Sequence, residues 1–326
     1  MAQAERIGVI GAGAFGTALA IAQAAAGRQV TLWARDPAQA AEMGQLRENR
    51  RRLAGVPLPE GIAVTADFHA VARAPVLLLA LPTQTLRGVL GAQAAALDGR
   101  SLIACSKGVE LGTGLLPAQI MAELVPGATC AVLTGPSFAV DIAQGKPTAL
   151  TLATAAPGSQ AETLQNTLST RNLRLYLSDD PTGAQLGGAL KNVIAIAAGI
   201  TMGAGLGESA RAALMTRGFA EMTRFAETRG ARPTTLSGLS GFGDLVLTCT
   251  SEKSRNYRHG LAIGAGQTPD ASKTVEGVMT AHALASSADH DALPVTCMVS
   301  ALLNGTVALP EAVELLLTRP LKRERD

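Results

Sequence analysis

The first third of the chain alternates short aliphatic or β-branched runs with segments that have a helical pattern. Because this alternation is typical of βαβ units, it predicts a parallel sheet with helices packed against it. Between the first two runs, residues 15–26 are rich in alanine and helical in pattern, and Gly27 supplies a C-terminal stop. The expected strands are Arg6–Ile10, Gln29–Trp33, 76–81, 102–106 and 131–134.

Two further strands are expected over residues 148–153 and 173–177, with a helix over 160–169 between them. Beyond them the β-branched runs fade, and the pattern becomes that of helices separated by loops that are rich in glycine or contain proline. We therefore predict an α/β domain over residues 1–183 and an all-α domain over residues 184–326. The length of 326 residues also favours two domains.

The net charge is close to neutral, with 28 lysine and arginine residues against 26 aspartate and glutamate residues. Nonspecific nucleic-acid binding needs a larger basic excess, so any anion must be bound by a local group. The N-terminus has no long apolar segment before a cleavage site, so we expect a cytoplasmic protein. Residues 186–206 are apolar but contain Lys191, Asn192 and several glycines, which predicts a buried helix and no membrane span.

The cysteine and histidine residues have no spacing typical of a metal site. The four cysteines are far apart, which favours reduced, buried thiols over a disulfide framework or a zinc knuckle. The four histidines lack ligand spacing as well, so no metal site is expected. The sequence contains no Gly-x-Ser-x-Gly elbow, so it offers no support for hydrolase chemistry.

A glycine-rich turn, Gly11-Ala-Gly13-Ala-Phe-Gly16, follows the first expected strand and opens the first helix. In such a turn the first glycine allows a tight bend, the second lets the backbone approach a pyrophosphate, and the third lets helix and strand pack closely. The N-terminus of the helix also favours negative charge. This context predicts a Rossmann dinucleotide-binding domain.

Arg35 stands at the end of the second expected strand. Rossmann domains often place an acidic residue there to bind the ribose 2′-hydroxyl. The cation of Arg35 suits a 2′-phosphate instead, although Asp36 next to it is able to take the acidic role. We therefore predict NADP as the preferred cofactor, with NAD as the alternative.

Two later strands lead into residues with binding potential. Residues 102–106 precede Lys107, and residues 131–134 precede the turn 135–139. Ligands of open α/β sheets lie outside the carboxyl ends of the strands. Lys107 is therefore a candidate to place a positive charge between cofactor and substrate, and the turn 135–139 is a candidate to offer backbone N–H donors. The alternative for both segments is an ordinary turn with no binding role.

Lys191 lies in an otherwise apolar helical segment. Desolvation lowers the pKa of a lysine, which brings it into range for proton transfer near neutral pH. Small neighbours such as Gly187 and Gly188, four and three residues away, leave space for a substrate beside the amine. They would equally admit a second helix, with Lys191 extending its amine to water. The residues alone leave both interpretations open.

Asp244 lies in a glycine-rich segment ahead of an apolar turn, where it is a candidate to fix the amine of Lys191 or a substrate hydroxyl. Ser254, Arg255 and Asn256 follow, and their hydroxyl, guanidinium and amide donors suit a phosphate. The patch is too small to indicate nucleic acid, and a solvated loop is the alternative.

Taken together, six segments along nearly the whole chain resemble, in order, the motifs of the NAD(P)-dependent glycerol-3-phosphate dehydrogenases of bacteria. These segments are residues 11–20, 33–36, 106–108, 135–139, 187–192 and 243–256. The resemblance implies a Rossmann domain followed by a helical domain similar to the C-terminal domain of 6-phosphogluconate dehydrogenase, with the active site between them. It also implies interconversion of dihydroxyacetone phosphate and sn-glycerol 3-phosphate, supply of glycerol 3-phosphate for phospholipid synthesis, and a homodimer.

The resemblance implies a role for individual residues. Lys191 would take the C2 hydroxyl proton as hydride leaves C2, and would return it in the reductive direction. The cofactor would be lined by Gly11, Gly13, Ala14, Phe15, Gly16, Arg35, Lys107, Ala139, Arg255 and Glu276. The substrate would meet Lys107, Gly135, Ser137, Lys191, Asp244, Ser254, Arg255 and Asn256, with Asn192 and Thr248 as weaker candidates. The chain departs from the family near Glu276, because residues 264–273 form a short segment and Thr274 replaces an aliphatic residue.

Two other functions stay open on the sequence. A β-hydroxyacid or 6-phosphogluconate-type dehydrogenase would share the fold and a lysine base, and its substrate would carry a carboxylate. A non-enzymatic regulator that senses NADPH would not need Lys191. Such a regulator would usually carry a module for DNA or a partner protein, and the sequence has no candidate for one.

Overall fold

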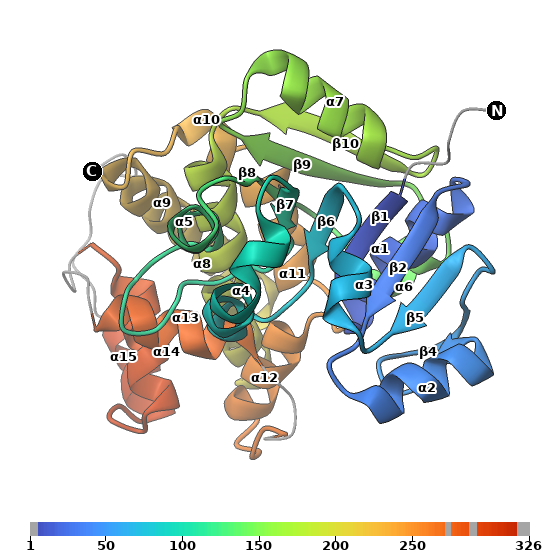
Figure 1. Cartoon of the computed structure of the whole chain (residues 1–326). Coiled ribbons are helices and arrows are strands. Elements are labelled where there is room, and N and C mark those ends of the chain that lie inside the picture. The colour runs from blue at the N-terminus through green and yellow to red at the C-terminus, as the bar shows by residue number, and fades with distance from the viewer. Residues whose placement is uncertain (1–5, 271–274, 287–291, 318–326) are drawn as a thin grey trace.

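A computed structural model describes residues 6–270, 275–286 and 292–317. The N-terminal part is built on an eight-stranded sheet with the strand order β10-β9-β8-β7-β6-β1-β2-β5 (Figure 1). The strands are β1 (Arg6–Ile10), β2 (Gln29–Trp33), β5 (Ile62–Thr65), β6 (Val76–Leu79), β7 (Ser101–Ala104), β8 (Thr129–Thr134), β9 (Thr148–Thr154) and β10 (Leu173–Ser178). All seven strands expected from the sequence are present, and β5 is added at one edge.

The sheet is mixed, which differs from the parallel sheet expected for this region. The six strands β5, β2, β1, β6, β7 and β8 are parallel, whereas β9 pairs with β8 in the antiparallel direction. The connection between β8 and β9 contains only the five-residue helix α6 (Ala139–Ala143). A five-residue helix is only about 7.5 Å long, too short to carry the chain back along β8, so the chain reverses at the end of that strand. Strand β10 then pairs with β9 in parallel.

Helices cover both faces of the sheet. One face packs against residues of α1, α2, α6 and α7, and the other against residues of α3, α4 and α5. Successive side chains of a strand point to opposite faces, so both faces of β6 are apolar: Leu78 packs on the side of α1, and Leu77 and Leu79 pack on the side of α4. The helices are α1 (Ala14–Ala25), α2 (Pro37–Leu46), α3 (Phe68–Ala72), α4 (Thr83–Leu97), α5 (Pro117–Leu124) and α7 (Gly158–Leu168).

A small antiparallel pair lies between α2 and β5. Its strands are β3 (Glu48–Asn49) and β4 (Leu53–Pro57). The Asn49 side chain is fully buried and donates hydrogen bonds to the Ala12 carbonyl (3.0 Å) and to Thr17 Oγ1 (2.7 Å). These two hydrogen bonds fix strand β3 against the glycine-rich turn and the start of α1.

The rest of the described chain is helical. Helix α8 (Pro181–Gly203) begins at Asp180, whose carboxylate accepts a hydrogen bond from Gly183 N (2.8 Å). Length and apolar composition alone would allow α8 to cross a membrane, but 89% of the apolar window is buried inside the protein, as in a core helix. The other helices are α9 (Gly207–Thr228), α10 (Pro233–Leu236), the π-helix η1 (Leu239–Gly243), α11 (Asp244–Cys249), α12 (Arg255–Gly264), α13 (Glu276–Ala285), α14 (Pro294–Leu303) and α15 (Leu309–Leu317).

Helices α8 and α12 approach each other at backbone distance through four glycines. A β-carbon on Gly199 would overlap the Tyr257 carbonyl oxygen, and one on Gly203 would overlap the Leu261 carbonyl oxygen. In the opposite direction, Gly260 and Gly264 rest on carbonyl groups of α8. The small residues of α8 therefore do admit a second helix, and this contact fixes α12 against the helix that carries Lys191.

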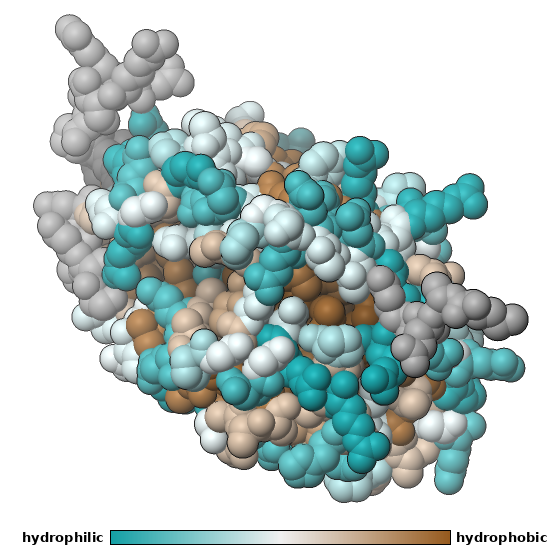
Figure 2. Space-filling view, turned by 45° about the horizontal axis from the view of Figure 1, so that its top comes forward, coloured by the Kyte–Doolittle hydropathy of each residue, from teal (hydrophilic) through white to brown (hydrophobic). Residues whose placement is uncertain are grey.

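The face of the molecule in Figure 2 has no large area of uniform hydropathy. Hydrophilic residues and residues of intermediate hydropathy are interspersed over that face, and the most hydrophobic residues are visible mainly in the hollows between them. This mixture is typical of a globular protein surface.

Candidate active site

The glycine-rich turn has the backbone that a pyrophosphate requires. Gly11 has a φ of +116°, which an L side chain rarely adopts, and a β-carbon on Gly16 would overlap the Gly11 carbonyl oxygen. A β-carbon on Gly13 would meet no atom within 4 Å, so the turn is open on that side. Ala14 and Phe15 form the first turn of α1, and Phe15 packs against the same core as Ala139, the first residue of α6.

Arg35 follows β2 and is exposed, and Asp36 beside it already has two partners. Asp36 Oδ1 accepts from Ala38 N (2.9 Å) as the N-cap of α2, while Oδ2 lies 3.2 Å from Arg51 Nη1. Arg51 also contacts Glu42 at 2.6 Å. The Asp36 carboxylate is therefore already engaged by Arg51 and by the start of α2.

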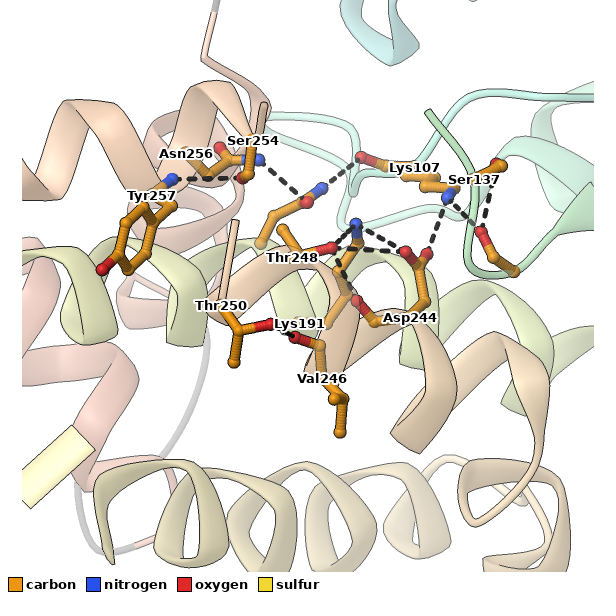
Figure 3. Close-up of polar contacts among 12 residues, drawn as sticks. Lys107, Ser137, Lys191, Asp244, Val246, Thr248, Thr250, Ser254, Asn256 and Tyr257 are labelled. Carbon is orange, nitrogen blue, oxygen red and sulfur yellow. Dashed lines mark hydrogen bonds and ion pairs between the residues drawn. The ribbon is translucent and has the colours of Figure 1, made fainter. Parts of the chain in front are cut away.

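The amine of Lys191 is buried between two oxygen atoms of α11. Its Nζ lies 3.0 Å from Asp244 Oδ1 and 2.6 Å from Thr248 Oγ1 (Figure 3). Gly187, one turn before Lys191 on α8, touches the backbone of η1. Helix η1 leads directly into Asp244, so this close contact brings α11 within reach of the lysine side chain. Thr248 thus contacts the lysine, whereas the sequence suggested it only as a weaker substrate contact.

Lys107 approaches the same carboxylate from the sheet. Its Nζ is 2.6 Å from Asp244 Oδ2 and donates to the Gly135 carbonyl (3.0 Å), which also accepts from Ser137 Oγ (3.3 Å). Asp244 therefore lies between two lysines, one from each domain (Figure 3). The sequence suggested Asp244 as a partner of Lys191 but had no signal for its contact with Lys107.

Burial sets the protonation behaviour of Lys191. Desolvation lowers its pKa to about 8, and the second lysine, Lys107, acts in the same direction. Asp244 opposes this shift because a neighbouring negative charge favours the ammonium form. An amine with this pKa is able to donate or accept a proton near neutral pH.

Ser254 and Asn256 lie at the start of α12. Ser254 is buried and caps the helix by accepting from Tyr257 N (3.2 Å). Asn256 Nδ2 donates to Asn192 Oδ1 (2.9 Å), and its own Oδ1 accepts from Gly277 N (3.0 Å). Asn192 stands next to Lys191 and also donates to the Lys107 carbonyl (3.4 Å). Side-chain amides therefore connect α8, α12 and α13 around the lysine.

Arg255 and Glu276 are the first residues of α12 and α13. Burial raises the pKa of Glu276 to about 7, while Arg255 and Lys107 lower it. Glu276 also lies near Gly108, where a β-carbon would be 3.7 Å from Oε2. The structure thus brings Glu276 to the Lys107 segment, although Thr274, where the sequence departs from the family, is outside the described residues.

Three buried hydroxyl groups near this cluster were not expected from the sequence. Thr83, Ser106 and Thr134 have no hydrogen-bond partner within the described part of the chain. Thr134 Oγ1 lies 2.8 Å from the position of a β-carbon on Gly188, and Thr83 Oγ1 lies 2.9 Å from one on Gly108. The only sequence signal for these residues is their position, because Thr134 ends β8, Ser106 follows β7 and Thr83 follows β6.

Most of the residues predicted to meet the substrate lie together, and Arg35 lies apart from them. Hydrogen bonds link these residues to one another or to their immediate neighbours; they are Lys107, Gly135, Ser137, Lys191, Asp244, Ser254 and Asn256. Arg35 instead follows β2. In the ranges that the structure describes, no group of three or more histidine, cysteine, aspartate or glutamate residues is arranged to hold a metal ion.

Comparisons with known proteins agree over almost the whole chain. Family models for the N-terminus and C-terminus of NAD-dependent glycerol-3-phosphate dehydrogenase match residues 6–159 and 180–314. A glycerol-3-phosphate dehydrogenase [NAD(P)+] of Ruegeria sp. is 56% identical over 98% of this chain and 99% of its own length, and one of Cereibacter sphaeroides is 57% identical over 98% and 100%. The crystal structure of glycerol-3-phosphate dehydrogenase from Coxiella burnetii has a TM-score of 0.91 at 34% identity, covering 97% of this chain and 99% of that one.

Proposed function

Because the chain belongs to the NAD-dependent glycerol-3-phosphate dehydrogenase family, we propose that it interconverts dihydroxyacetone phosphate and sn-glycerol 3-phosphate. The single observation that supports this best is the buried contact of Lys191 with Asp244 and Thr248. A lysine with a pKa of about 8 matches a reaction that moves one proton between the C2 oxygen and the protein.

Lys191 is the acid and base of the proposed reaction. In the reductive direction its ammonium donates a proton to the C2 oxygen, and in the oxidative direction its neutral amine takes that proton back. Asp244 orients the amine and compensates its positive charge. Lys107 holds the second carboxylate oxygen, so it fixes Asp244 and adds positive charge where the oxygen of the substrate becomes negative.

The phosphate of the substrate is bound by Ser254, Arg255 and Asn256 in this proposal. These residues offer hydroxyl, guanidinium and amide donors at the start of one helix, whose N-terminus favours an anion. The phosphate does not react, so its binding energy positions C2 beside Lys191. Gly135 and Ser137 contact the substrate from the turn after β8.

The turn around Gly13 fits a nicotinamide dinucleotide, because the space beside Gly13 is open at the N-terminus of α1. When bound, the nicotinamide supplies or accepts the hydride. Within this chain the residues proposed to hold the cofactor are Gly11, Gly13, Ala14, Phe15, Gly16, Arg35, Lys107, Ala139, Arg255 and Glu276. The buried hydroxyls of Thr83, Ser106 and Thr134 are further donors that the site leaves unused.

NADP is the preferred cofactor in this proposal, with NAD as the alternative. Arg35 is exposed, and we find no carboxylate within ion-pair distance of it in the described ranges, so its guanidinium is able to meet a 2′-phosphate. Asp36, which would bind the ribose hydroxyls of NAD, is held by Arg51 and by the N-terminus of α2. We further propose a cytoplasmic homodimer that supplies glycerol 3-phosphate for phospholipid synthesis, with its two domains dividing at residue 183.

The test is oxidation of NADPH by the purified protein with dihydroxyacetone phosphate, beside unphosphorylated dihydroxyacetone and with NADH in parallel. Rapid oxidation that depends on the phosphate supports the proposal and ranks the two cofactors. If NADPH binds but is not oxidised, the substrate is wrong, and β-hydroxyacids are the next to be tried. Arg255→Ala should mainly impair use of the phosphorylated substrate, and unchanged kinetics would refute its phosphate role.

A further inference from the structure

Lys253 connects the two domains beside the proposed phosphate site. It immediately precedes Ser254 in the segment between α11 and α12. Its Nζ lies 3.2 Å from both carboxylate oxygens of Asp141 in α6, and 5.6 Å from the centre of the Phe138 ring. One ammonium group from the helical domain therefore contacts a carboxylate and an aromatic face of the α/β domain.

Asp141 is suited to hold this ammonium group. Its carboxylate is largely covered, with 23% of the side chain exposed, and it also lies 2.7 Å from Lys146 Nζ of its own domain. Hydrogen bonds from Lys146 and Lys253 hold the pKa of Asp141 below its ordinary value, so the group is charged at neutral pH. The two lysines thus share one carboxylate, and only Lys253 crosses between domains.

The two ends of this contact belong to opposite sides of the proposed substrate site. Phe138 follows Ser137, which contacts the Gly135 carbonyl together with Lys107. Lys253 precedes Ser254 and Arg255. The segment from residue 250 to 254 lies outside any helix. Its position relative to the turn after β8 therefore depends on side-chain contacts such as this one.

We propose that Lys253 is a positioning residue, which holds the Ser254–Asn256 segment against the turn after β8 at the spacing that the substrate phosphate requires. This inference rests on the proposed phosphate role of that segment. Lys253 acts through the backbone of Ser254 and Arg255 and does not itself react. Its loss therefore weakens substrate binding more than it slows the chemical step.

A simpler effect needs to be separated from this one, because any cation near the site also attracts an anionic substrate through space. Lys146 provides the matched control. It contacts the same carboxylate as Lys253, it is similarly exposed, and Lys146→Gln removes the same charge. It lies in the same domain as Asp141, so it does not connect the domains.

The experiment compares Lys253→Gln, Lys146→Gln, Asp141→Asn and the double variant Lys253→Gln/Asp141→Asn with the unchanged chain. Lys253→Gln should raise KM for dihydroxyacetone phosphate roughly fivefold, the size expected for one partly exposed ion pair, with kcat changed less than about twofold. Asp141→Asn should give the same result, and the double variant should add little. Lys146→Gln should leave KM within about twofold, and Lys253→Arg should restore it.

Hydrogen–deuterium exchange supplies a second measurement that does not depend on turnover. Amides of residues 250–256 should exchange faster in Lys253→Gln and Asp141→Asn, and at the original rate in Lys146→Gln. Equal KM increases for the two lysine variants would overturn the proposal in favour of through-space attraction, as would unchanged exchange. If the unchanged chain does not reduce dihydroxyacetone phosphate, the proposed function fails, and the exchange data alone decide whether Lys253 holds the segment.

Discussion

Lys191 Nζ and Asp244 Oδ1 lie 3.0 Å apart, although the two residues are 53 positions apart in the sequence and both are almost fully buried. An isolated buried charge is costly, so each group depends on the other and on Thr248 and Lys107. Two positive charges share one carboxylate in this arrangement. The surplus positive charge keeps the lysine easy to deprotonate and makes the site attractive for an anion.

Replacement of Lys191 by methionine should abolish turnover without loss of the fold. Methionine fills similar volume, and Asp244 keeps its contact with Lys107, so no carboxylate is left alone. We expect kcat to fall about 10²- to 10⁴-fold, the usual contribution of a positioned acid or base. NADPH binding, measured by fluorescence titration, and Tm should both be retained. Substantial residual turnover would remove Lys191 from the mechanism.

The two reaction directions should respond to pH in opposite ways. Reduction requires the ammonium form of Lys191, so kcat should fall as the pH rises through about 8. Oxidation requires the neutral amine, so kcat should rise over the same interval. Steady-state kinetics in both directions provide the measurement. Profiles that are flat across this range, or that change in the same direction, would contradict the proposed proton transfer.

Arg51 should contribute to cofactor choice without any need to contact the cofactor. In Arg51→Gln, Asp36 loses its ion pair and becomes free to accept ribose hydroxyls and to repel a 2′-phosphate. The ratio of NADPH to NADH affinity should fall about fivefold, consistent with an exposed pair. Binding of 2′,5′-ADP and 5′-AMP, measured by calorimetry, tests this directly. Arg50→Gln is the control, because Arg50 pairs with Glu48 instead; an equal change there would point to net charge alone.

Gly199→Ala should destabilise the protein by about 2–3 kcal/mol, because the new methyl group would overlap the Tyr257 carbonyl and force α8 and α12 apart. Urea unfolding gives the free energy. Gly88→Ala in α4 is the matched control, since a β-carbon there meets no atom within 4 Å and alanine favours a helix. That variant should be as stable as the original or slightly more stable. Similar losses in both variants would show that the glycine contact is unimportant.

Local patterns were sufficient for much of the fold. The glycine-rich turn, the alanine-rich α1 and the aliphatic strands are each defined by residues close together in the sequence, and the structure confirms them. Strand β5 was missed because it has only four residues, β3 because it has only two, and β4 because it contains a glycine and a proline, which are uncommon in strands. The antiparallel direction of β9 was missed as well, because it depends on how the chain turns after β8.

Prediction of the candidate site was limited by contacts between distant segments. Lys191 was identifiable as a charge in an apolar helix, and Asp244 as a carboxylate beside glycines. Nothing local indicates that Asp244 also holds Lys107, 137 positions away, or that Thr248 contacts the amine. These contacts form only when η1 packs on Gly187 and when Lys107, which follows β7, lies beside Asp244 in the folded chain. The assigned roles of the site residues stay predictions until the variants are measured.

The glycine contact between α8 and α12 has a consequence for substrate size. Lys191 belongs to one of these helices, and Ser254 caps the other. Since their backbones touch at Gly199 and Gly260, neither helix is able to slide along the other without steric overlap. The span from the proton-transferring amine to the proposed phosphate donors is therefore constant. In the proposed site, a molecule with one carbon more or fewer between its hydroxyl and its phosphate would place one end correctly and the other end wrongly, so we expect the helix pair to select substrates by length.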